Sequence, residues 1–150
     1  MRISLASDSL DGVAPLVAPE LRRRGHTVIL HGALADERAD WAWSCESAAR
    51  DVSAGHADQA VVCCWTGTGA SIAANKVPGV RAALCVDAPT ADGARTWNDA
   101  NVLALSLRLT SPQVLVEILD AWFAGSVSAD AGDVANIAHV DEISQPRSLS

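Results

Sequence analysis

Five short apolar runs alternate along the chain with segments in which apolar residues recur at helical spacing. Short apolar runs bounded by turn-forming residues are typical of buried strands. Strands are therefore expected at residues 2–6, 27–32, 60–64, 81–87 and 101–107. The run at 60–64 is almost continuously apolar, which indicates a strand that is buried on both faces of a sheet.

The segments between these runs carry helical patterns. Val13, Leu16, Val17 and Leu21 recur at the steps of one helix face, and Gly25 is a typical helix end. Further helices are expected at residues 44–54, 70–76, 89–97 and 112–125, with a weaker helical pattern over 137–143. The last strong helix has proline near its start and glycine at its end, which are favoured flanks of a helix.

Strands that alternate with helices predict right-handed βαβ units. We expect a three-layer αβα, Rossmann-like fold with a five-stranded parallel sheet, formed by one domain over residues 1–143 and followed by a flexible tail at 144–150. Binding sites in such folds form beyond the carboxyl ends of the strands. Asp8, the loop after Cys64, residues 87–90 and Arg108 should therefore meet along one edge of the sheet.

Composition narrows the classes of function. The chain has 150 residues, a formal net charge of −7 and 49% hydrophobic residues. A nucleic-acid partner is not expected, because phosphate backbones need clustered positive charge. No stretch approaches the roughly 20 apolar residues of a membrane span, and the start of the chain reaches a charged residue too early for a signal peptide. Four cysteines, two of them adjacent, favour a reducing cytoplasm over a disulfide framework.

The sequence CCWTGTG places a thiol, Cys64, directly before a glycine-rich turn. A strand that leads through such a turn into a helix exposes backbone N–H groups that bind an anion or a developing oxyanion. The spacing fits neither a P-loop nor a dinucleotide-binding fingerprint. A thiol at a helix N-terminus can act as a base or nucleophile, while a buried core cysteine is the alternative. Core positions are expected for the other cysteines, Cys45, Cys63 and Cys85.

Two segments carry a family resemblance. Residues 64–76, CWTGTGASIAANK, and 97–105, WNDANVLAL, resemble the type B ribose-5-phosphate isomerase family, which includes the galactose-6-phosphate isomerase subunits. Its members carry Cys-Gly-Thr-Gly-x-Gly-x-Ser-Ile-Ala-Ala-Asn-Lys and then His-Asn-Asp-Ala-Asn-Val-Leu, and weaker similarity extends over residues 2–143. The resemblance implies the same fold, a small-molecule substrate, no metal or organic cofactor, and homodimers or homotetramers whose active sites lie between subunits.

The chemistry of that family moves a proton between adjacent carbons through an enediolate, which requires a base and fixed donors for an oxyanion. The resemblance makes Cys64 the base, and Thr66, Gly67 and Gly69 the turn that receives the anion. It assigns contacts with the substrate to Asp8 and Asn98. Arg108 matches an arginine that some members use on the substrate phosphate.

The sequence departs from the family at several of these positions. Ser9 and Trp97 replace histidines, and Trp97 replaces the one credited with opening the sugar ring; indole is only a hydrogen-bond donor. Ala135 and His139 align with two arginines that clamp the phosphate, so most charge-assisted contacts with a phosphate are lost. Trp65 replaces a glycine of the turn. Asp40-Trp41-Ala42, followed by Trp43, replaces an Asp-Tyr-Pro segment.

Four of the five tryptophans thus fall at positions that line the family pocket. This predicts a pocket changed from sugar-phosphate recognition to stacking on an apolar or planar ligand, with ordinary packing as the alternative; Trp122 is expected in the core. The residues expected to contact the substrate are Ser9, Trp41, Trp43, Trp65, Gly67, Gly69, Trp97, Asn98, Arg108 and His139, beside the catalytic set Cys64, Thr66 and Asp8.

Four hypotheses of function remain open at this point. One is a divergent isomerase with cysteine-based proton transfer on a non-phosphorylated or ring-bearing hydroxy-carbonyl substrate, in specialised biosynthesis. Another is ordinary interconversion of ribose-5-phosphate and ribulose-5-phosphate. A third, from a different class, is a non-catalytic partner subunit or ligand-binding module, although the intact Cys64 loop argues against it. The last keeps the enediolate for epimerisation, dehydration or rearrangement.

Overall fold

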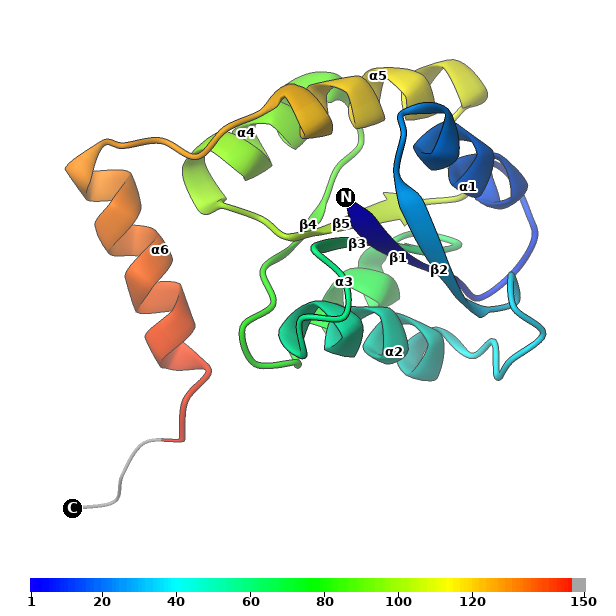
Figure 1. Cartoon of the computed structure of the whole chain (residues 1–150), viewed down its shortest axis with the longest axis horizontal. Helices are drawn as coiled ribbons and strands as arrows, with labels where there is room; N and C mark the ends of the chain where they lie inside the picture. The colour runs from blue at the N-terminus through cyan, green and yellow to red at the C-terminus, as the bar shows by residue number, and fades with distance from the viewer. Residues whose placement is uncertain (147–150) are drawn as a thin grey trace.

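The computed structural model describes residues 1–146 and has a single parallel sheet between layers of helices (Figure 1). Its strands are β1 (Arg2–Ser7), β2 (Thr27–Gly32), β3 (Gln59–Cys64), β4 (Ala82–Leu84) and β5 (Val102–Ser106). Their order is β2-β1-β3-β5-β4, and every neighbouring pair is parallel. The expected five-stranded α/β fold is confirmed.

Helices cover both faces of the sheet. They are α1 (Ala14–Arg23), α2 (Trp41–Ser53), α3 (Thr68–Asn75), α4 (Ala88–Asn98), α5 (Pro112–Ala124) and α6 (Ala131–Ile143). Figure 1 shows α1, α4 and α5 over one face and α2 and α3 over the other. Trp122, on α5, is 1% exposed and donates its indole N–H to Gln59 Oε1 at 2.8 Å, which confirms its expected place in the core.

The central strand β3 explains why two adjacent cysteines behave differently. Successive side chains of a strand point to opposite faces of the sheet. Val61 and Cys63 pack in the core beneath α1, α4 and α5, whereas Ala60, Val62 and Cys64 pack in the core beneath α2 and α3. The last residue of β3 therefore presents its sulfur on the side of the sheet from which α3 begins.

Some expected boundaries were wrong. The strand expected at 81–87 is only Ala82–Leu84, because Asp87 instead caps α4 by accepting the N–H of Thr90 at 2.9 Å. The helix expected from Ser44 begins at Trp41. The weak pattern over 137–143 belongs to a full helix, α6, whose first turn is capped by Asp130.

Helix α6 stands at one side of the sheet and contacts α4 (Figure 1). None of its residues is buried in the described part of the chain. Arg81, which is itself largely buried, holds it through an ion pair with Asp141 at 2.9 Å. Apolar side chains of α6, such as Val134, Val140 and Ile143, remain exposed.

Two further expectations concern the C-terminal tail and membrane-spanning helices. The tail expected at 144–150 falls largely on residues 147–150, which lie outside the described residues. Among the helices of residues 1–146, none combines the length and the apolar character that crossing a membrane requires.

Candidate active site

A cleft of about 260 Å³ opens where β1 and β3 end. The residues that line it are Asp8, Trp41, Cys64, Trp65, Thr66, Thr68 and Gly69. All but Thr68 were expected at the site from the sequence. The cleft thus collects a thiol, a carboxylate, two hydroxyl groups and two indole rings within one small volume.

Strand pairing puts the carboxylate beside the thiol. β1 and β3 are paired with Ser7 opposite Cys63, and the N–H of Asp8 donates to the carbonyl of Cys63 at 3.3 Å. Asp8 and Cys64 therefore leave adjacent strands at the same level of the sheet. This is the carboxyl edge, where the parallel topology predicts a site.

The turn after Cys64 depends on Gly67. This residue has a φ of +75° and directly precedes α3, and positive φ is a conformation that side chains with a Cβ rarely adopt. A Cβ here would lie 2.5 Å from Leu84 Cδ1 and 2.9 Å from the backbone of Leu105 and Ser106. Gly67 is buried, so it shapes the turn and is not among the residues that line the cleft.

Cys64 is the one cysteine of the four that lines the cleft. Its Sγ accepts a hydrogen bond from the N–H of Ala70, in the first turn of α3, at 3.4 Å. Donors at a helix N-terminus stabilise negative charge, and the Cys64 sulfur lies beside one of them. Burial raises the pKa of Cys45 and of Cys85 to about 12 and raises that of Cys63 as well, which keeps these thiols neutral.

Asp8 brings an unsatisfied acceptor to the cleft. Its Oδ1 is buried and has no hydrogen-bond partner among residues 1–146. Burial raises the pKa of this carboxyl, and the charge of Asp11 raises it further, while its own backbone N–H acts in the opposite direction. A buried acceptor without a donor costs free energy, and the residue that carries it lines the cleft.

Thr68 is the residue that the sequence analysis missed. Its Oγ1 lies 2.8 Å from Oγ1 of Thr66, and both side chains line the cleft. The signal that could have found it is its position at the start of a helix directly after the glycine turn. The hydroxyl pair adds donors beside the backbone N–H groups of the turn.

Only two of the four candidate tryptophans reach this cleft. Trp41 packs its ring against Gly69, where a Cβ would lie 2.9 Å from the indole Cε3, and Trp65 lines the same space. Trp43 does not line it. The Arg38 guanidinium lies over the Trp43 ring, 3.5 Å from the ring centroid. Trp97 lies on α4, where it lines other recesses.

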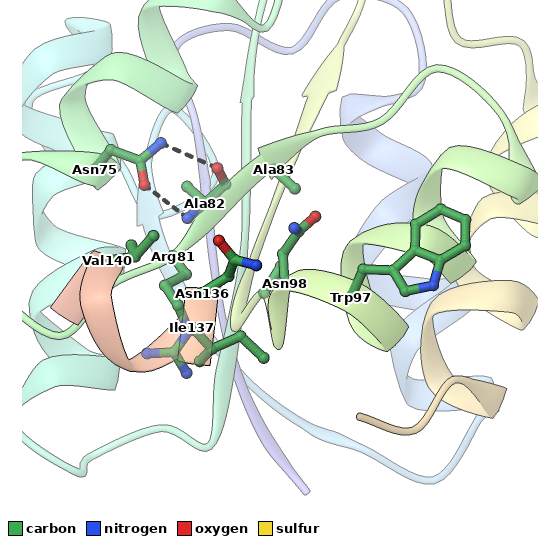
Figure 2. A pocket seen from close by; sticks show the side chains of 10 residues that line it. Asn75, Arg81, Ala82, Ala83, Trp97, Asn98, Asn136, Ile137 and Val140 are labelled. Carbon is green, nitrogen blue, oxygen red and sulfur yellow. Dashed lines mark hydrogen bonds between the residues drawn. The ribbon is translucent and has the colours of Figure 1, made fainter. Parts of the chain in front are cut away.

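The recess at the end of α4 is a separate feature of about 250 Å³ (Figure 2). Asn98, from α4, and Asn136, from α6, extend into it, and the Asn75 amide pairs with the backbone of Ala82 on the edge strand at 2.8 and 3.0 Å. Helix α4 begins at the carboxyl edge of the sheet and runs back for 11 residues, or about 16 Å. Asn98 and Trp97 therefore lie far from Cys64 of the same chain.

Three other expected residues lie outside the cleft. The hydroxyl of Ser9 accepts the N–H of Asp11 at 3.2 Å within its own turn. Arg108 donates its backbone N–H to the carbonyl of Trp65 at 2.9 Å, while its side chain is exposed and does not line the cleft. His139 is exposed on α6 and pairs with Glu142 at 3.3 Å.

Charge in the cleft is negative. Asp8 is the one charged residue among the described residues that line it. Over the same part of the chain, no group of three or more His, Cys, Asp and Glu side chains could hold a metal ion. The side chains that line the cleft offer one thiol, one carboxyl group and two hydroxyl groups.

Comparison with known proteins decides the family. Residues 3–143 match the sequence profile of the Ribose/Galactose Isomerase family. The chain belongs to this family. The resemblance noted in residues 64–76 and 97–105 is thereby confirmed, and so is the expectation of an enzyme of the aldose–ketose isomerase class.

Members of the ribose/galactose isomerase family resemble this chain over most of its length. The galactose-6-phosphate isomerase subunit LacB of Clostridium acetobutylicum is 33% identical over 95% of this chain and 83% of its own. Ribose-5-phosphate isomerase B of Escherichia coli is 38% identical over 71% of each chain. The solved structure of ribose-5-phosphate isomerase B from Clostridium thermocellum superposes with a TM-score of 0.86 at 35% identity, over 95% of this chain and 97% of that one.

The turn predicts a sharp difference between two glycines. Gly67→Ala should lower the free energy of unfolding by about 3 kcal/mol or more, because the new Cβ meets strain at positive φ and a backbone clash. Gly79 has a similar φ, +80°, but nothing within 4 Å of its Cβ position. Gly79→Ala should therefore cost only about 1 kcal/mol. Urea unfolding of both variants measures the difference, and equal losses would contradict the packing described at Gly67.

Proposed function

We propose that the protein is an isomerase that uses Cys64 for proton transfer through an enediolate, on an altered hydroxy-carbonyl substrate that is non-phosphorylated or ring-bearing. The observation that carries this proposal is the Cys64 sulfur, which lines a cleft with Asp8 and Thr66 and accepts the N–H of Ala70 at 3.4 Å. Membership of the ribose/galactose isomerase family supports the reaction class.

The reaction balances within the cleft. The Cys64 thiolate removes the proton from the carbon that bears the hydroxyl group beside the substrate carbonyl, and the electron pair of that C–H bond moves into the enediolate. The oxygen charge that develops faces the hydroxyls of Thr66 and Thr68 and the N–H groups of the turn. Asp8 accepts a substrate hydroxyl. The Cys64 thiol then returns the proton to the former carbonyl carbon, while the proton of the other enediolate hydroxyl moves to the charged oxygen. That first hydroxyl carbon becomes the new carbonyl, which converts ketose to aldose or the reverse.

The names of the relatives describe phosphorylated sugars as substrates, whereas the cleft of this chain offers little to bind a phosphate. In residues 1–146, no arginine, lysine or histidine lines the cleft, although a phosphate is held best by charge-assisted donors. Asp8 would repel a phosphate placed beside it. Within the same chain, Arg108 could contribute from outside the cleft. These observations favour a non-phosphorylated substrate over ribose-5-phosphate.

A second subunit completes the site in this proposal. Trp97, Asn98 and His139 lie on α4 and α6, whereas Cys64 lies at the opposite edge of the sheet. Helix α6 leaves Val134, Val140 and Ile143 exposed, which is unfavourable for a surface that faces water alone. We therefore expect a homodimer, or a homotetramer built from it, in which this end of one subunit faces the Cys64 cleft of the other.

The proposal also includes a compartment, the need for a cofactor and a type of pathway. All four are free in the structure, which suits a reducing compartment such as the cytoplasm. The reaction as written needs no metal or organic cofactor. A substrate without phosphate also fits specialised biosynthesis better than central sugar-phosphate metabolism.

The direct test is proton exchange in heavy water, followed by NMR. The substrates are ribose-5-phosphate, ribulose-5-phosphate and a panel of unphosphorylated hydroxy-ketones. Cys64→Ser should lower the exchange rate by at least about a hundredfold, because the base is lost. Cys85→Ala, which changes a buried cysteine away from the cleft, should retain the wild-type rate.

The substrate pattern separates the hypotheses. Cysteine-dependent exchange confined to unphosphorylated substrates supports the proposal. Efficient, cysteine-dependent turnover of ribose-5-phosphate would contradict the altered substrate. Exchange that survives Cys64→Ser would contradict the mechanism, and no exchange with any substrate would favour a non-catalytic partner subunit.

The shared site predicts complementation between two inactive variants. Cys64→Ala and Asn98→Ala should each lose most of the exchange activity. When the two are unfolded together and refolded at equal amounts, random pairing should restore about a quarter of the wild-type rate, because half of the dimers carry one intact site of two. Variants refolded separately are the control, and a mixture as inactive as its parts would show that both residues must lie in one chain.

A further inference from the structure

The two tryptophans of the cleft are unlike the structural tryptophan of this protein. Trp122 is 1% exposed and its N–H is bonded to Gln59, whereas Trp41 and Trp65 are 44% and 53% exposed beside Cys64. A half-exposed indole gains little from packing in its own chain. Large aromatic surfaces left open at a polar site are typical of ligand contacts.

Trp41 is held in place from both directions. It begins α2, whose first turn is fixed by backbone bonds from Trp43 and Ser44 to Asp40, and its ring rests on Gly69. The same indole also lines a groove of about 370 Å³ between α2 and α3, which includes Ile72. Trp41 therefore forms a wall between that groove and the Cys64 cleft.

The contact with Gly69 makes the wall specific to this pair of residues. A Cβ at position 69 would lie 2.9 to 3.4 Å from three atoms of the Trp41 ring. Glycine at position 69 therefore lets the indole pack closely against the start of α3.

We propose that Trp41 and Trp65 form an aromatic slot that binds a planar ring of the substrate beside Cys64, and that Trp41 selects aryl-bearing hydroxy-ketones. This inference rests on the proposed function, because it assigns the hydroxy-carbonyl end of the same substrate to Cys64 and Asp8. The apolar walls of the cleft are the two indoles, and its polar groups are the thiol, the carboxylate and the threonine hydroxyls. A neutral ring joined to a hydroxy-ketone matches both sets.

Two probe ligands measure how much an aromatic ring on the ligand adds to binding. Phenacyl alcohol and hydroxyacetone carry the same hydroxy-ketone group, and only the first has an aromatic ring. Binding of each is measured by ligand-observed NMR in a Cys64→Ser background, where turnover does not interfere. With both tryptophans intact, this Cys64→Ser protein should bind phenacyl alcohol at least about tenfold more tightly than hydroxyacetone, since aromatic contacts of this kind are worth about tenfold.

Variants of Trp41 and Trp65 test whether these two residues cause the preference for the ring-bearing probe. Trp41→Ala and Trp65→Ala should each reduce the ratio of the two affinities by about five- to tenfold, while Trp41→Phe, which keeps a flat ring, should retain most of it. Gly69→Ala should reduce the ratio by displacing the Trp41 ring. Ile72→Ala is the matched control: it removes an exposed apolar side chain from the groove on the other side of Trp41 and should leave the ratio unchanged.

The outcomes separate this inference from the proposed function. A ring preference that depends on Trp41 and Trp65 supports the slot even if no Cys64-dependent exchange is found, in which case only the proposed reaction fails. Equal affinities for the two probes in the Cys64→Ser protein with both tryptophans intact would overturn the slot, while the proposed Cys64 chemistry would still stand. A preference that survives both tryptophan variants but is lost in Ile72→Ala would also overturn it, because the ring would then lie in the groove between α2 and α3.

Discussion

The parallel pairing of β1 with β3 is the constraint on which the site depends. With Ser7 opposite Cys63, the two strands release Asp8 and Cys64 at the same edge, and a shift of one residue would move Cys64 to the other face of the sheet. The turn that follows is possible because Gly67 adopts a positive φ against the backbone of β5. The turn brings the N–H of Ala70, in the first turn of α3, to the sulfur. One strand register and one glycine therefore position the thiol, the carboxyl group and the N–H donor together.

The path of α4 explains why the remaining candidate residues lie elsewhere. A helix that connects two parallel strands must run back across the sheet, so α4 carries Trp97 and Asn98 away from the carboxyl edge where it begins. Helix α6 lies beside it and has no buried residue in the described chain. A single subunit thus separates two sets of residues that the family resemblance assigns to one site. A second copy is the simplest way to bring them together.

The sequence pattern predicted the sheet and most helices because hydrophobic periodicity reports burial. It failed where side-chain chemistry decides the boundary: Asp87 ends the strand expected at 81–87 by capping α4. Which residues line the cleft was predicted correctly where they directly follow the end of a strand, as with Cys64, Trp65 and Thr66. Trp41 and Trp43 could not be separated in this way. Positions two apart on a helix face different directions, and the pattern had not placed the start of α2 at Trp41.

The reactivity of the four thiols in the folded protein tests the central claim most directly. Iodoacetamide is added to the native protein, and each cysteine is followed by mass spectrometry of its peptide over time. Our account predicts that Cys64 is alkylated first, at least about tenfold faster than Cys45, Cys63 and Cys85, because it alone lines the cleft and is 5% exposed, whereas the other three are fully buried. Alkylation of Cys64 as slow as that of the three core cysteines would contradict its assignment as the base.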